Sequence, residues 1–190
     1  SLLALLGVFV FDAQGLHVHM ERGDSRMRTA HAHSPLETRR HRRGIRLHWH
    51  RLVEPPLAGV VDIVDALIHA VRCQQPRFAI ATLDSAIQRG VASSEQIDQV
   101  FAALPERFRV LRRFLDSRAE SGTESLVRLM LVRLGCCVDA QVFLDRVGRV
   151  DLVVDGWLVI ECDSHAHHSE WRQRLRDYRR DVELARQGYC

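Results

Sequence analysis

The chain has 190 residues, a formal net charge of +3 and 46% hydrophobic residues. This composition excludes a wholly disordered chain, a collagen-like repeat and a coiled coil, and it favours a packed protein of one domain or two small ones. The most apolar stretch, residues 2–11, is about half the roughly 20 residues of a membrane-spanning helix, so we expect no membrane span. Five cysteines without a CxxC pair favour a reduced, cytoplasmic protein over a disulfide framework.

Positive charge is concentrated in residues 21–51, which contain nine arginines against three acidic residues. Every basic residue of the chain is an arginine, and the densest group comprises Arg39, Arg40, Arg42 and Arg43. Most charge runs are solvated loops, but this composition is also typical of segments that neutralise nucleic-acid phosphates. We therefore expect these four arginines to bind DNA.

Residues 1–117 are predicted to form a small α+β region. Two segments, 16–20 and 45–51, alternate apolar residues with His or Arg, which is typical of half-exposed strands on either side of the basic loop. Helical periodicity follows, and Ser94 is the expected N-cap of the third helix. The four helices are expected at 60–71, 78–88, 94–103 and 107–115.

A short polar stretch at 117–122 marks the expected boundary with a second domain, residues 118–190. This domain is predicted to have the order α-β-β-β-α, with a further strand expected beyond Cys190. Its first and last elements are amphipathic helices, each followed by glycine. The helices are expected at 123–134 and 170–187, and the strands at 137–143, 147–154 and 157–163.

Four acidic residues of the second domain stand at positions that call for a chemical explanation. Asp151 interrupts an apolar strand, Glu161 and Asp163 end the next strand, and Glu124 lies on the preceding helix. An unpaired buried carboxylate is costly, and a divalent cation would offset that cost. Hard oxygen ligands suit Mg²⁺ or Mn²⁺ better than zinc.

The turn between the last two strands decides whether these carboxylates can meet. Glu161 and Asp163 are two residues apart and therefore point to the same face. Asp151 joins them only if Val154 pairs with Leu158 across a three-residue loop, because a two-residue turn would place it on the opposite face. The Asp-Gly pair in this loop is typical of hairpin turns, so we predict the three-residue loop.

These segments resemble a known family. The sequences GRVDLVV at 148–154, LVIECDSHAHHS at 158–169 and RDYRRD at 176–181, with a closing Gly-Tyr, are similar to the very-short-patch-repair-like (Vsr-like) endonuclease domain of the PD-(D/E)xK restriction-endonuclease-like superfamily. The resemblance runs from about residue 120 to the end and implies an α/β, restriction-endonuclease-like fold with an α-β-β-β-α-β core. The region before it is similar to that of AbiEi-antitoxin-like actinobacterial proteins.

The resemblance implies a Mg²⁺- or Mn²⁺-dependent endonuclease that hydrolyses phosphodiester bonds in DNA, in repair or phage defence. The metal would lower the pKa of its bound water and stabilise developing phosphate charge. Double-strand cutting by such a site would call for a homodimer. The resemblance assigns metal ligation to Asp151, Glu161 and Glu124, adds Asp163 and His168 to the catalytic set, and gives Gln141 a supporting role.

The chain departs from the superfamily's usual pattern at one position. The residue two after the glutamate is usually a lysine, whereas Asp163 stands here, as in the E-x-D pattern of the subgroup. Ser164 replaces the glycine that usually follows. On the last helix, the resemblance implies that Arg179 and Arg180 bind a phosphate or hold Asp163 and Glu161 in place, although charged residues at this spacing are most often a solvated ladder.

Each of these residues also has a structural interpretation. Ser121 and Glu124 have the spacing of a capping box. Asp151 could pair with Arg149 or Arg146 at a strand end, and Asp163 could cap the turn into the last helix. His168 is either a proton donor to the leaving oxygen, a phosphate contact or an exposed loop histidine.

Two other functions compete with the endonuclease. The first is a DNA-binding regulator or antitoxin-like protein whose nuclease fold no longer cuts DNA. The second is a zinc-dependent hydrolase, which is disfavoured because the His-x-His-His motif at 165–168 has no second ligand cluster at a zinc spacing.

Overall fold

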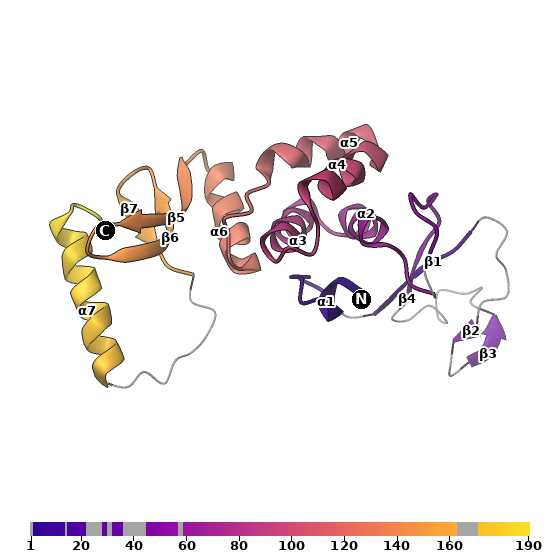
Figure 1. Cartoon of the computed structure of the whole chain (residues 1–190), viewed down its shortest axis with the longest axis horizontal. Coiled ribbons are helices and arrows are strands. Elements are labelled where there is room, and N and C mark those ends of the chain that lie inside the picture. The colour runs from indigo at the N-terminus through magenta and orange to yellow at the C-terminus, as the bar shows by residue number, and fades with distance from the viewer. Residues whose placement is uncertain are drawn as a thin grey trace.

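The computed structural model describes residues 2–13, 15–21, 28–29, 32–35, 45–56, 59–162 and 171–190, which form the mixed α/β arrangement drawn in Figure 1. The chain opens with a short helix, α1 (Leu2–Leu5), whose Leu3 side chain is buried. No helix in these ranges combines the length and the apolar content needed to cross a bilayer. None of the five cysteines forms a disulfide.

The two strands expected around the basic loop are present and pair with each other in parallel. They are β1 (Leu16–His19) and β4 (Ile45–His48), and His19 lies opposite His48. Between them in sequence, β2 (Arg28–Thr29) and β3 (Ala32–Pro35) form a separate antiparallel pair. The parallel pairing places every second residue of both strands on one face of the sheet.

Each helix of the helical layer begins within a few residues of the start that the periodicity indicates. Its helices are α2 (Ile63–Cys73), α3 (Pro76–Gln88), α4 (Ser94–Ala103) and α5 (Glu106–Arg109), and a 3₁₀ helix (Val110–Phe114) continues α5. Their apolar faces form one core with Leu67, Leu83 and Val100 fully buried. The expected helix at 107–115 is therefore split into two short pieces.

The N-cap of α4 differs by one residue from the expectation. Ser93, not Ser94, is the cap, since its Oγ accepts a hydrogen bond from the Gln96 amide and the Gln96 side chain accepts one from the Ser93 amide. The reciprocal pair forms only when the glutamine stands three residues after the cap. Ser93 meets this condition and Ser94 does not.

The C-terminal part has the predicted order α-β-β-β-α. It consists of α6 (Gly122–Arg133), β5 (Val138–Leu144), β6 (Gly148–Val154), β7 (Leu158–Ile160) and α7 (Trp171–Arg186). The three strands form one antiparallel sheet in the order β5-β6-β7, and α6 and α7 lie on opposite sides of it (Figure 1). A second, smaller core contains Val150 and Val153.

The predicted register of the last hairpin is confirmed. Val154 pairs with Leu158, which leaves the three-residue loop 155–157. Asp155 and Gly156 both have positive φ, 50° and 77°, a conformation that Asp and Gly adopt more readily than most residues. β7 itself is shorter than the expected 157–163. Along it, the Val159 amide donates to the Cys190 carbonyl, so the chain end runs beside this strand.

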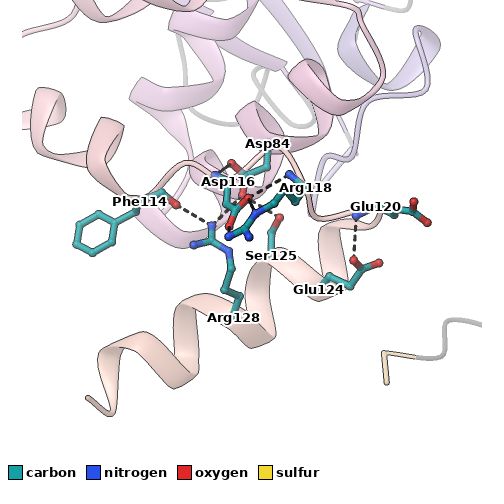
Figure 2. A network of polar contacts seen from close by, with 8 residues as sticks. All are labelled: Asp84, Phe114, Asp116, Arg118, Glu120, Glu124, Ser125 and Arg128. Carbon is teal, nitrogen blue, oxygen red and sulfur yellow. Dashed lines mark hydrogen bonds and ion pairs between the residues drawn. The ribbon is translucent and has the colours of Figure 1, made fainter. Parts of the chain in front are cut away.

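Helix α6 contacts both the helical layer and the sheet. Gly122 at its start lies against the Phe9 ring, and a Cβ there would approach the ring to 2.1 Å. Further along, Arg128 forms a buried ion pair with Asp84 of α3 at 3.1 Å (Figure 2). The expected boundary between residues 117 and 118 thus stands just before a helix that packs on the helical layer as well as on the sheet.

Candidate functional site

Asp151 and Glu161 lie side by side because of the confirmed register. The pair Leu152–Ile160 places the next residues, Asp151 and Glu161, opposite each other across β6 and the end of β7. The Asp151 amide donates to the Glu161 carboxylate at 3.3 Å, and the Cys162 amide donates to the Asp151 carboxylate at 2.7 Å. Two carboxylates from neighbouring strands therefore share one side of the sheet.

Glu124 reaches this pair from α6 and is 4% exposed. Its carboxylate accepts hydrogen bonds from the Glu120 amide at 2.9 Å (Figure 2) and from the Gln141 side chain at 2.7 Å. Only half of the expected capping box forms: Ser121 Oγ accepts a hydrogen bond from the Glu124 amide, while the Glu124 carboxylate bonds Glu120 rather than Ser121. The glutamate side chain is thus directed towards the sheet.

Gln141 connects two of the three carboxylates, those of Glu124 and Asp151. Its Nε2 donates to Glu124 and, at 3.3 Å, to Asp151, so one amide group bridges α6 and β6. The Gln141 backbone has φ +55° inside β5. The residues before and after Gln141 pair with β6, whereas Gln141 itself has no partner residue in the register of these two strands. Its Oε1 is buried and has no hydrogen-bond partner in the ranges that the structure describes. Backbone strain and an unsatisfied buried oxygen at one residue are typical of functional sites.

The arginines near the site differ in their contacts. Arg180 of α7 donates to the Glu161 carboxylate at 2.7 Å and to the Arg149 carbonyl at 3.0 Å, which is the holding role expected for it. Arg179 is exposed. Arg149 pairs with Glu120, and Arg146 lies near its neighbour Asp145, so neither has Asp151 as its ion-pair partner.

Burial and neighbouring charges shift the pKa of Glu161. Burial raises the pKa of the Glu161 carboxyl, the negative charge of Asp151 raises it further, and its hydrogen bonds and Arg180 oppose this rise. A cation placed near both carboxylates would favour their ionised forms. The donor set consists of carboxylate oxygens and the unpartnered amide oxygen of Gln141, which suits a hard cation such as Mg²⁺.

The three carboxylates are not as tightly gathered as ligands around an ion. Within the described ranges, the sole group of three ligand-type side chains whose ligand atoms all lie within 4.8 Å of one another is His17, His48 and Cys73. The carboxylate cluster is instead joined through Gln141 and backbone amides. Two expected catalytic residues, Asp163 and His168, lie outside the described residues, as do the predicted DNA-binding residues Arg39, Arg40, Arg42 and Arg43.

Sequence reasoning missed the histidine and cysteine group. It considered zinc only for the motif at 165–168, which also lies outside the described residues. The signals were present, since LHVH at 16–19 and LHWH at 47–50 repeat histidine at the spacing of one strand face, and His69 and Cys73 are one helical turn apart. Only the parallel pairing of β1 with β4 brings them together.

The chain matches no family model, and no curated protein or solved structure is significantly similar to it. Its function must therefore be inferred from the two side-chain clusters.

Proposed function

We propose that the chain is a metal-dependent DNA endonuclease with a restriction-endonuclease-like domain at residues 118–190. The observation that carries this proposal is the pairing of Val154 with Leu158, which sets Asp151 beside Glu161. These two acids and Glu124 would hold Mg²⁺ or Mn²⁺. The resemblance to Vsr-like endonucleases points to the same residues, so the strand register and the motif pattern support one site.

The side chains of the site would have different roles. A bound metal would supply an activated water and stabilise negative charge on the phosphate. Arg180 orients Glu161, and Gln141 keeps Glu124 next to Asp151. With no lysine in the chain, His168 and Asp163 are the proposed groups for proton transfer. The arginines of 39–43 and Arg179 would neutralise DNA phosphates, and cutting of both strands would require a homodimer.

The proposal is tested by nicking of supercoiled plasmid with Mg²⁺, Mn²⁺ or EDTA. We expect nicking by the unchanged chain with either metal, none with EDTA, and a loss of at least about 100-fold in the double variant Asp151→Asn, Glu161→Gln, since metal ligation is lost. Asp139→Asn is the matched control, because Asp139 is an exposed acid on the same sheet and should leave nicking unchanged.

Two readouts keep the outcome decisive. Circular dichroism and thermal unfolding establish that each variant is folded, and a gel shift measures DNA binding separately from cutting. Folded protein that shifts DNA but does not nick it with any metal would overturn the endonuclease and favour the DNA-binding regulator. Equal nicking by the double variant would remove these acids from the site.

A further inference from the structure

Six potential metal ligands gather between the two-stranded parallel sheet and α2, far in sequence from the carboxylate cluster. The strands contribute histidines of one sheet face, and α2 covers that face with a histidine and a cysteine one turn apart. The six residues, here called the histidine cluster, are His17, His19, His48, His50, His69 and Cys73.

Three of these side chains already have the spacing of ligands around one ion. His17 Nδ1 lies 3.0 Å from His48 Nε2 and 3.9 Å from Cys73 Sγ, and the three ligand atoms are all within 4.8 Å of one another. Around tetrahedral zinc, with Zn–N about 2.0 Å and Zn–S about 2.3 Å, neighbouring ligand atoms lie roughly 3.3–3.6 Å apart. Small shifts of these side chains would suffice to close the site.

We propose that His17, His48 and Cys73 form a Zn²⁺-binding site. Imidazole nitrogens and a thiolate are the ligands that select zinc over Mg²⁺. His69 is the nearest candidate for a fourth ligand, because its ring is stacked on that of His48 with the centroids 4.2 Å apart. This site is separate from the carboxylate cluster and does not depend on nuclease activity.

Unpartnered buried nitrogens favour a bound ion over a purely hydrogen-bonded stack. His69 is 6% exposed, and its Nε2 has no hydrogen-bond partner among the described residues. Within the described part of the chain, the buried ring nitrogens His19 Nδ1 and His50 Nε2 also lack partners. Buried polar atoms are normally satisfied. A hydrogen bond between His17 and His48 would explain that pair alone and would leave the other three rings unexplained.

Zinc binds neutral imidazoles and a thiolate rather than a thiol. Binding would therefore convert the Cys73 thiol to a zinc thiolate and release its proton to solvent.

A cavity gives access to the histidine cluster. Its volume is about 900 Å³, and its wall includes His17, His69 and Cys73 beside apolar side chains such as Phe78. An ion can therefore approach two of the three proposed ligands, His17 and Cys73, from this side without unfolding α2.

The test is a metal titration of the chelator-treated full chain at pH 7, first with Co²⁺ as a spectroscopic probe and then with Zn²⁺. We expect a thiolate-to-cobalt charge-transfer band, displacement of cobalt by one equivalent of zinc, and a rise in the melting temperature with zinc. Cys73→Ser should abolish the band and weaken zinc binding by at least about 100-fold. Cys136→Ser, a half-buried cysteine outside the histidine cluster, should change neither.

Two results would overturn the site. One is cobalt or zinc binding without a thiolate band in the unchanged chain, combined with no zinc-dependent rise in its melting temperature. The other is binding that survives Cys73→Ser and His48→Gln but disappears when His165, His167 and His168 are all replaced by Gln, which would assign the metal to that motif. The melting-temperature measurement uses the unchanged chain and so remains decisive even if a variant fails to fold.

Discussion

At the scale of single residues, Gln141 is the point on which the carboxylate cluster depends. Its amide donates to Glu124 and Asp151, and its backbone occupies the left-handed region to do so. A non-glycine residue in that region costs roughly 1–2 kcal/mol. The two hydrogen bonds to carboxylates offset this cost, because bonds to charged groups contribute more than neutral ones.

Replacing this donor by an acceptor should expose the repulsion between the carboxylates. We expect Gln141→Glu to lower the free energy of unfolding by about 2–3 kcal/mol in EDTA, since both hydrogen bonds are lost and a further negative charge is added. Millimolar Mg²⁺ should recover part of this loss. Urea unfolding at pH 7 in the two buffers measures both effects.

The exposed residue Gln88, at the end of α3 and outside the carboxylate cluster, provides the control, and Gln88→Glu should stay within about 0.5 kcal/mol of the unchanged chain. If Gln141→Glu were as stable as the control in EDTA, the amide bridge would not hold the cluster together.

Some contacts of the two side-chain clusters can be predicted from the sequence, and others cannot. Asp151 and Glu161 were predictable as neighbours because strand alternation and a hairpin loop are local. The link from Glu124 through Gln141 was not, since it needs a positive φ within a strand. The histidine cluster was not predictable either, because it depends on a parallel pairing between strands that are distant in sequence, with Leu16 opposite Ile45.

At the scale of elements, the helices follow their sequence signals closely, and their ends depend on single caps. For α4 the capping box involves Ser93 and Gln96, while Ser94 contacts only its neighbour Glu95 at the exposed surface. The helical pattern alone does not distinguish two adjacent serines. The spacing of three residues to Gln96 does, which is why the expected Ser94 was wrong by one position.

The two serines form a matched pair for measurement. Ser93→Ala should lower the free energy of unfolding by about 1 kcal/mol, because it removes the acceptor for the Gln96 amide. Ser94→Ala should change it by less than about 0.5 kcal/mol. Urea denaturation of both variants provides the comparison, and equal losses in the two would contradict Ser93 as the sole cap of α4.

At the scale of the whole molecule, α6 couples the helical layer to the sheet. Asp84 of α3 is fully buried and accepts hydrogen bonds from the Asp116 amide, Ser125 Oγ and Arg128 Nη2, as Figure 2 shows. Arg128 also donates to the Phe114 carbonyl. Sequence periodicity placed α6 in the second domain, but it could not reveal this network because the partners come from three separate segments.

From the buried Asp84–Arg128 pair we predict how much stability Asp84→Asn loses and how this loss depends on pH. We expect Asp84→Asn to lower the free energy of unfolding at pH 7 by about 3 kcal/mol, because Ser125 Oγ and Arg128 donate to the same carboxylate oxygen and an asparagine NH₂ in its place cannot accept these bonds. Asp98→Asn, in an exposed pair with Arg112, should cost less than about 1 kcal/mol. Denaturant unfolding of the two variants at pH 7 measures this contrast.

Acidification should widen the gap between the unchanged chain and Asp84→Asn. Burial raises the pKa of Asp84 to about 6 in the folded chain, whereas an unfolded aspartate titrates near 3.9. As the pH falls, the folded chain therefore takes up a proton on Asp84 before the unfolded chain does. The stabilisation that this proton uptake gives is fully present below about pH 4 and is lost as the pH rises through 6. The asparagine side chain of the variant does not titrate, and the stability difference should grow by about 1 kcal/mol between pH 7 and pH 5. A difference that shrinks over this range would mean that Arg128 and the other two donors outweigh burial and hold the pKa of Asp84 below its ordinary value.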